Sequence, residues 1–148
     1  MTEEEKSIGF VCLANYCRSP VAENLFKKKF SNSFKVDSAG INPMIAAGMD
    51  LRSVKYLKNN DVPHKMHIPK RIDKKFLNSS HIIFAMDTLV LMQLNKIFKN
   101  YRNKFKLFTY QHRNLQINDP YKLSNEKYEI VMDEIKFVID SIEIEELC

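Results

Sequence analysis

The pattern of hydrophobic and polar positions predicts short strands that alternate with helices along the chain. Four short apolar runs, each bounded by polar or turn-forming residues, are typical of buried strands. They span residues 8–13, 34–38, 81–85 and 105–108. Strands that are joined by helices in this way form a parallel sheet covered on both sides. We therefore expect an α/β fold: a doubly wound, four-stranded parallel sheet with helices on both faces, flavodoxin-like or Rossmann-like.

The helices are predicted from apolar residues three and four positions apart and from polar residues that cap a helix start. One helix follows the first strand, and the last helix carries a single apolar stripe over residues 128–142. Between them, Asp50 is expected to cap a second helix, Asp73 a short third one, and Asp87 or Thr88 a fourth. Each of the four strands is thus followed by helical sequence.

Length and composition limit the possible classes of protein. The 148 residues contain no repeat, low-complexity tract or linker, so we expect a single domain over residues 1–148. The acidic start MTEEEK is not a secretory signal, and the longest apolar run, residues 82–86, is too short to span a bilayer. These features favour a soluble, cytoplasmic protein with no membrane partner.

Charge and cysteine content narrow the choice further. The net charge of +5 comes from lysine and arginine clusters, which suit an anionic partner or form an ordinary solvated surface. No nucleic-acid motif accompanies them, and three glycines supply no glycine-rich nucleotide loop. No second Cys/His pair completes a zinc site with Cys12 and Cys17. We therefore expect no nucleic-acid partner, no metal and no cofactor.

The polar turn CLANYCRS at the exit of the first strand is the strongest chemical signal. Successive main-chain N–H groups in such a turn form an anion cradle, and the helix that starts near Ser19 and Pro20 adds its positive end. Arg18 supplies a planar fork that matches two phosphate oxygens. These groups are expected to favour the thiolate form of Cys12, which would make it a nucleophile for phosphorus. The alternative is that Cys12 is a small core residue.

A phosphatase also needs a proton donor for the leaving oxygen, and Asp119 is the candidate. Asp119 lies in the irregular segment Asn118-Asp119-Pro120-Tyr121, where the proline disfavours helix. Tyr121 is placed to wall an aromatic substrate. The same residues also form ordinary turns, so this segment alone does not decide between the two interpretations.

Taken together, these segments resemble the low-molecular-weight protein tyrosine phosphatases. Residues 12–20 follow the family's loop C-L-G-N-x-C-R-S-P. The sequences VDSAG at residues 36–40 and FAMD at residues 84–87 are similar to two internal signatures, and residues 119–121 are similar to the general-acid loop. The resemblance runs from about Ile8 to the last helix, nearly the whole chain.

The resemblance implies a protein-tyrosine-phosphatase that hydrolyses phosphotyrosine and small aryl phosphates through a phosphocysteine intermediate. Cys12 would attack phosphorus, Arg18 would bind the equatorial oxygens, and Asp119 would protonate the leaving phenolate and then activate water. The implied partners are a phosphotyrosine-containing protein or peptide and the product, inorganic phosphate. The implied assembly is a monomer or a weak dimer.

The resemblance also assigns supporting residues. Asn15 would take a left-handed conformation braced by Ser19, Ser38 and His67, although His67 is alternatively a simple loop residue. The implied phosphate-binding residues are Leu13, Ala14, Asn15, Tyr16, Cys17 and Ser19, and the implied substrate pocket is formed by Tyr16, Met44 and Tyr121.

Three departures from the family pattern bear on substrate preference. Ala14 replaces the usual glycine, which would cost roughly 1–2 kcal/mol if this position required a positive φ. Lys122 stands where many members carry a second tyrosine. Residues 42–50 contain no aromatic residue, so Met44 or Ile45 is expected to line the pocket instead.

The second cysteine of the turn suggests redox regulation. In an extended strand, Cys12 and Cys17 would lie about 16 Å apart, whereas a disulfide needs Cα atoms within roughly 4.4–6.8 Å. Only a loop curled around an anion brings them that close, so Cys17 is predicted to protect an oxidised Cys12 as a resolving thiol. The alternative is that Cys17 only packs beneath the loop.

Other functions on the same fold remain alternatives. An arsenate reductase needs two further cysteines, which are absent between Cys17 and Cys148. A protein-arginine phosphatase carries a small threonine where this chain has Tyr16. A non-catalytic phosphate-binding module would have lost Cys12, Arg18 or Asp119, and all three are present.

Overall fold

The computed structural model describes residues 5–30 and 33–147. Four parallel strands form one sheet in the order β2-β1-β3-β4. The strands are β1 (Ser7–Cys12), β2 (Lys35–Gly40), β3 (Ile82–Ala85) and β4 (Phe105–Leu107). The predicted four-stranded parallel sheet is confirmed, with boundaries that differ by one or two residues.

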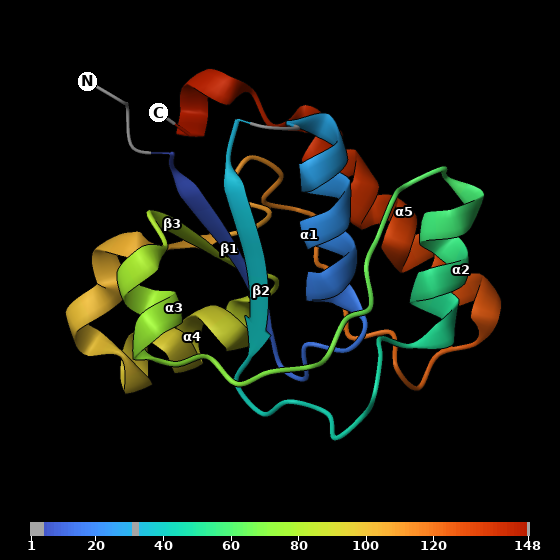
Figure 1. Cartoon of the computed structure of the whole chain (residues 1–148), viewed down its shortest axis with the longest axis horizontal. Coiled ribbons are helices and arrows are strands. Elements are labelled where there is room, and N and C mark those ends of the chain that lie inside the picture. The colour runs from blue at the N-terminus through green and yellow to red at the C-terminus, as the bar shows by residue number, and fades with distance from the viewer. Residues whose placement is uncertain (1–4, 31–32, 148) are drawn as a thin grey trace.

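Helices cover both faces of the sheet, as predicted (Figure 1). One face carries α1 (Arg18–Lys29), α2 (Leu51–Asn59) and α5 (Asn125–Ser141), and the other carries α3 (Lys74–Ser79) and α4 (Thr88–Ile97).

Side chains alternate between the two faces along each strand, because successive residues of a strand point to opposite sides. In β1, Phe10 and Cys12 belong to the larger core beneath α1 and α5, whereas Val11 belongs to the smaller core beneath α3 and α4. The rings of Phe10 and Phe84 stack at 5.5 Å between centroids, which ties β1 to β3 within the larger core. The side chain of Cys12 therefore lies on the face of the sheet that α1 covers.

Polar side chains start the helices where the sequence predicted them. Asp50 accepts a hydrogen bond from the Arg52 N–H, and Asp73 accepts one from the Phe76 N–H. Of the two candidates for α4, Asp87 is the cap, because its carboxylate accepts from the Val90 N–H. Each cap satisfies a main-chain donor that has no partner inside its helix.

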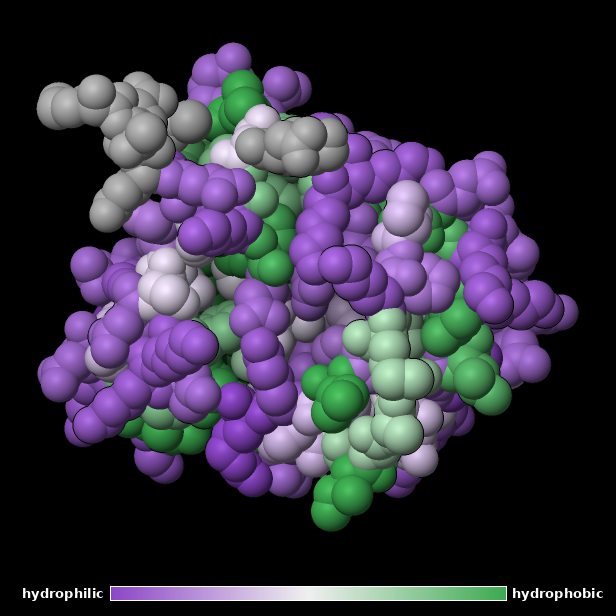
Figure 2. Space-filling model, in the orientation of Figure 1, coloured by the Kyte–Doolittle hydropathy of each residue, from purple (hydrophilic) through white to green (hydrophobic). Residues whose placement is uncertain are grey.

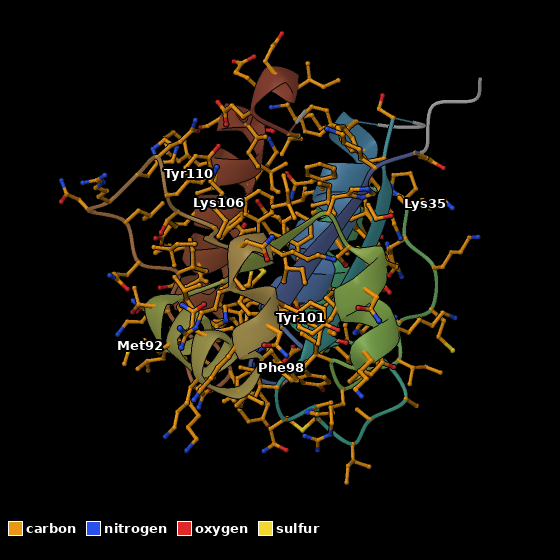
Figure 3. All side chains as sticks on the ribbon, turned by 90° about the vertical axis from the view of Figure 1, so that its left-hand side faces the viewer. Lys35, Met92, Phe98, Tyr101, Lys106 and Tyr110 are labelled. Carbon is orange, nitrogen blue, oxygen red and sulfur yellow. The ribbon has the colours of Figure 1, made fainter. Side chains whose placement is uncertain are left out.

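Two short 3-10 helices were not predicted, η1 (Lys99–Lys104) and η2 (Ile144–Leu147). Their few residues show no helical period that a sequence pattern could reveal. Phe98 and Tyr101 from the α4–η1 region pack against the smaller core, and Lys106 lies over the ring of Tyr110 (Figure 3).

Within residues 5–30 and 33–147, no helix is long and apolar enough to cross a membrane. Residues 1–4 of the acidic start and Cys148 lie outside the described residues.

The strand order places the functional segments side by side. β1 is central and pairs with both β2 and β3, so the chain leaves β1 and β3 toward opposite faces. Ligands of doubly wound sheets bind beyond the carboxyl ends of the strands at such a switch point. The segment after β1 is the CLANYCRS turn, and Asp87 follows β3. The fold therefore brings these two segments to one edge.

Candidate active site

The turn after β1 curls into a closed loop whose carbonyl groups are all bonded outward. Within the described chain, each carbonyl oxygen from residue 12 to residue 17 accepts a hydrogen bond from outside the loop. The donors are Ile41 N to Cys12 O, Asn42 N to Leu13 O, Met44 N to Ala14 O, His67 Nε2 to Asn15 O, Asp50 N to Tyr16 O and Ser53 Oγ to Cys17 O. Because the carbonyl oxygens of the loop are bonded to donors outside it, the main-chain N–H groups are left facing the inside of the loop. Such an arrangement of N–H groups binds anions.

Cys12 lies at the floor of this loop, and the residue is 2% exposed. Its sulfur accepts a hydrogen bond from the Asn15 N–H at 3.2 Å, and it lies 3.0 Å from the Ser19 hydroxyl oxygen. Both groups favour the negatively charged form of the sulfur. These two donors distinguish Cys12 from a cysteine that is packed only among apolar side chains.

Asn15 shapes the loop through its left-handed backbone, with φ of 52°. Its side-chain amide donates to Ser19 Oγ at 2.9 Å and to Ser38 Oγ at 3.0 Å, and its oxygen accepts from the Lys70 N–H at 3.0 Å. His67 Nε2 lies 2.7 Å from the Asn15 carbonyl and must be the donor there, since a carbonyl only accepts. The structure thus brings the predicted supporting residues around Asn15, together with Lys70, which the sequence did not indicate.

The direction of these hydrogen bonds is fixed from Glu23, a residue that sequence reasoning missed. Ser38 Oγ donates to Glu23 Oε1 at 2.6 Å, so the Ser38 oxygen can accept from Asn15. Ser19 Oγ also accepts from Asn15, which leaves its own proton free for the Cys12 sulfur. The chain of hydrogen bonds therefore supplies a donor to the thiolate.

Two small residues fit the loop for different reasons. Ala14 has no positive φ, because among the described non-glycine residues only Asn15 and Asp61 do. The replacement of glycine by Ala14 therefore causes no backbone strain. Gly40, at the end of β2, is required because the loop lies too close for any side chain. A Cβ there would lie 2.9 Å from Asn15 N and 2.9 Å from Leu13 O. The glycine of the VDSAG segment thus allows β2 to support the loop from below.

Arg18 begins α1 and is only 3% exposed. Its Nη1 donates to Asp87 Oδ2 at 2.6 Å and to the Ile117 carbonyl at 2.7 Å. Burial alone would lower the pKa of Arg18, but Cys12 and Asp87 outweigh it and raise the pKa above the ordinary value. Nε and Nη2 have no acceptor within the described residues, so they are available for an anion. The sequence indicates Asp87 as a helix cap and as the end of the FAMD segment, whereas its ion pair with Arg18 becomes visible only in the three-dimensional fold.

A pocket of about 500 Å³ opens above the loop. It is lined by Cys12, Leu13, Ala14, Tyr16, Cys17, Arg18, Asn42, Pro43, Met44, Ile45, Asp119 and Tyr121. The rings of Tyr16 and Tyr121 meet edge to face, with centroids 6.0 Å apart, and form one wall. Met44 and Ile45 also line the pocket, and they come from the segment that lacks aromatic side chains. Figure 2 shows hydrophobic side chains over the segments that follow β2 and α2, near the edge of the sheet at which β1 and β3 end.

Asp119 lines the same pocket as Cys12, although 107 positions separate the two residues. Its Oδ1 accepts from the Tyr121 N–H at 3.1 Å, which folds the segment around Pro120. The side chain is otherwise exposed to the pocket and to solvent. Lys122 is exposed and does not line the pocket.

Cys17 has a different environment from Cys12. The residue is 5% exposed, and its thiol points to Asp50, with 3.9 Å between Sγ and Oδ2. Burial, together with the charges of Asp50 and Cys12, raises the pKa of the Cys17 thiol to about 12. Cys12 and Cys17 are both free thiols. Among residues 5–30 and 33–147, no cluster of histidine, cysteine or acidic side chains could hold a metal ion.

The first turn of α2 contributes one further site residue that the sequence did not reveal, Arg52. Arg52 donates to the carbonyl groups of Tyr121 and Leu123, at 2.8 and 2.9 Å. It also forms an ion pair with Asp50. A local pattern could not indicate these bonds, because about 70 positions separate Arg52 from its two carbonyl partners.

Comparison with known proteins agrees with this geometry. Residues 7–144 match the family model described as low molecular weight phosphotyrosine protein phosphatase. A relative of that name from Mus musculus is 33% identical over 137 residues, which cover 85% of this chain and 86% of the mouse protein.

Solved structures show the same fold. Vibrio vulnificus Wzb in complex with benzylphosphonate superimposes with a TM-score of 0.84 at 26% identity, covering 92% of this chain and 95% of that one. An arginine phosphatase, YwlE from Geobacillus stearothermophilus, reaches a TM-score of 0.83 at 24% identity, covering 91% and 88% of the two chains, and shows the shared fold. Because the family model extends from β1 to the end of α5, this chain belongs to the low molecular weight phosphotyrosine protein phosphatase family.

Proposed function

We propose that this protein is a tyrosine phosphatase that hydrolyses phosphotyrosine in proteins or peptides, and small aryl phosphates, through a phosphocysteine intermediate. The observation that carries the proposal is the closed loop around Cys12, whose carbonyl groups are all bonded outward. The loop leaves N–H groups and the free edge of Arg18 for the three equatorial oxygens of a phosphoryl group. The relatives are named for the same activity.

In the first step, the Cys12 thiolate attacks phosphorus, and an S–P bond forms as the bond between phosphorus and the phenolic oxygen breaks. Asp119, in its protonated form, donates its proton to the leaving oxygen. Arg18 and the main-chain N–H groups stabilise the charge on the equatorial oxygens. This charge stabilisation is supplied by the chain's own groups, so we propose that the reaction needs no cofactor.

In the second step, water attacks the phosphocysteine, and the Asp119 carboxylate takes up its proton. The S–P bond breaks, inorganic phosphate leaves, and the Ser19 hydroxyl donates to the thiolate that departs. The 3.0 Å separation between Ser19 Oγ and Cys12 Sγ supports this role.

The pocket supports an aromatic substrate. Tyr16 and Tyr121 form a wall against which a planar ring can pack, and Met44 adds a flexible apolar contact. In a protein-arginine phosphatase we expect a smaller residue than Tyr16 at this position. We further propose that the protein acts in the cytoplasm, as a monomer or weak dimer.

The two cysteines of the loop support a proposal of redox regulation. Peroxide would oxidise the Cys12 thiolate to a sulfenic acid. The Cys17 thiolate would then attack the Cys12 sulfur, so that an S–S bond forms and hydroxide leaves as water. A thiol reductant would restore both cysteines.

Turnover of an aryl phosphate without added metal tests the proposed function. We expect Cys12→Ser and Arg18→Ala to abolish measurable turnover while circular dichroism shows an intact fold, because they remove the nucleophile and its matched charge. Asp119→Ala should retain weak turnover, lowered by about 10²–10⁴-fold for poor leaving groups. Retention of most activity by Cys12→Ser would refute the mechanism. Turnover of a phosphoarginine peptide in preference to a phosphotyrosine peptide would refute the substrate class.

A further inference from the structure

The first turn of α2 contacts two loops of the active site at the same time. On one side, Asp50 N donates to the Tyr16 carbonyl at 3.0 Å, and Ser53 Oγ donates to the Cys17 carbonyl at 2.9 Å. On the other side, Arg52 donates to the carbonyl groups of Tyr121 and Leu123. One rigid helical turn therefore sets the position of the Asp119 segment relative to the phosphate loop.

Arg52 is itself held in place. Its Nε and Nη2 donate to the two carboxylate oxygens of Asp50 at 3.1 and 3.0 Å. Its guanidinium carbon lies 4.0 Å from the centroid of the Tyr128 ring, so the plane is supported by α5. The Tyr128 hydroxyl in turn bonds to Ser53 on α2. These contacts remove most of the freedom of a long side chain, which makes its two bonds to the loop specific.

The segment that carries Asp119 has few other anchors. Its own bonds are local: Tyr121 N donates to Asp119 Oδ1 and Leu123 N donates to the Pro120 carbonyl. Among the described residues, the hydrogen bonds that reach the main chain of residues 118–123 from elsewhere all come from Arg52. Two positions before Asp119, Arg18 holds the Ile117 carbonyl. Asp119 is thus fixed between two arginine anchors, one on each side.

We propose that Arg52 is a positioning residue for the general acid, an inference that rests on the proposed function. Arg52 would hold the Asp119 carboxyl at the distance from phosphorus that proton transfer to the leaving oxygen requires. A displacement of about 1 Å in such a group costs about 100-fold in rate. Lysine cannot replace Arg52 fully, because the contacts to Asp50, Tyr121 and Leu123 use the whole planar fork.

The test compares substrates that differ in their need for a proton. We expect Arg52→Ala to lower kcat/KM for phenyl phosphate by about 100-fold, but for 2,4-dinitrophenyl phosphate by less than about threefold, since its leaving group needs little protonation. Arg52→Lys should lie between the wild type and Arg52→Ala. Lys55→Ala, which removes an exposed charge from the next turn of α2, is the matched control and should behave as the wild type.

A double-mutant cycle distinguishes positioning from a general loss of structure. If Arg52 acts through Asp119, Arg52→Ala should add little to the loss already caused by Asp119→Ala for phenyl phosphate. Additive losses, or equal losses for both substrates, would overturn the proposal. Circular dichroism of each variant checks that the comparison is made between folded proteins.

Hydrogen exchange gives a readout that does not depend on catalysis. We expect the main chain of residues 118–123 to exchange faster in Arg52→Ala, and to a smaller degree in Arg52→Lys, whereas residues 12–17 keep their protection. Unchanged exchange in residues 118–123 would overturn the anchoring role even if turnover fell. Absence of turnover in the wild type would instead refute the proposed function, and the exchange result would still decide the role of Arg52.

Discussion

Cys12 and Cys17 lie in one loop, yet the groups that face their sulfur atoms have opposite electrostatic effects. Cys12 Sγ faces an N–H group and a hydroxyl, both hydrogen-bond donors. Cys17 Sγ faces the carboxylate of Asp50 and is the donor itself. The loop thus separates a thiol suited to attack from one that burial keeps protonated, with a pKa raised to about 12.

This difference determines how the proposed redox regulation should depend on pH. At pH 7 the thiolate fraction of a thiol with a pKa of about 12 is about 10⁻⁵, so attack on an oxidised Cys12 should be slow. We expect disulfide formation after peroxide treatment to accelerate about tenfold per pH unit above pH 7. Mass spectrometry of thiol-labelled protein at fixed times measures this rate.

The matched variants for this experiment are Cys17→Ser and Cys148→Ser. Cys17→Ser should keep near-normal turnover of aryl phosphates but lose much of the recovery that a thiol reductant gives after peroxide. Cys148→Ser removes one thiol while keeping the loop sequence intact, and should recover as the wild type does. Full recovery of Cys17→Ser would show that Cys17 only packs beneath the loop.

At the scale of elements, local sequence predicted the parts but not all the contacts between them. The strands, the last helix and the caps follow from apolar periodicity and capping chemistry, which act over a few residues. The CLANYCRS turn could be predicted for the same reason, since its cradle and its helix start are contiguous. Asp87, Glu23 and Arg52 could not be predicted as site residues. Their partners lie on other elements, and only the completed sheet brings them together.

The stability of the fold should depend on pH through Asp50, the residue that caps α2. Burial alone would raise the pKa of Asp50, but hydrogen bonds from the side chain and main chain of Arg52 outweigh it, so the pKa lies below its ordinary value. A carboxylate whose pKa is lower in the folded state stabilises the fold above its unfolded pKa. That contribution is lost as the pH falls through the folded value.

We therefore expect Asp50→Asn to be less stable than the wild type at pH 7, and the difference to shrink as the pH falls from about 5 to about 3. Asparagine retains the helix cap, so this variant isolates the charge. Asp50→Ala also removes the cap and should lose about 1 kcal/mol more at every pH. Urea unfolding at several pH values measures both. A difference between wild type and Asp50→Asn that is constant with pH would contradict the linkage.

At the scale of the whole molecule, one edge of the sheet collects the reacting groups, and the surface around it sets which substrates arrive. The net charge of +5 favours anionic partners, which phosphorylated peptides are. The lysine and arginine clusters lie at mostly exposed positions that do not line the pocket, so they act only as a weak general field. Lys122 differs from them because it directly follows Tyr121, which walls the pocket and is 46% exposed.

Lys122 should therefore favour peptides with acidic residues next to the phosphotyrosine. We expect Lys122→Ala to lower kcat/KM for such a peptide by about two- to fivefold, the worth of an exposed ion pair, and the effect to fade at high salt. Hydrolysis of a small aryl phosphate should not change, because that substrate does not reach beyond the pocket. Lys99→Ala removes the same charge from η1 and is the control for net charge alone. Equal effects of the two substitutions on the acidic peptide would show that the general field, and not the residue beside the pocket, sets this preference.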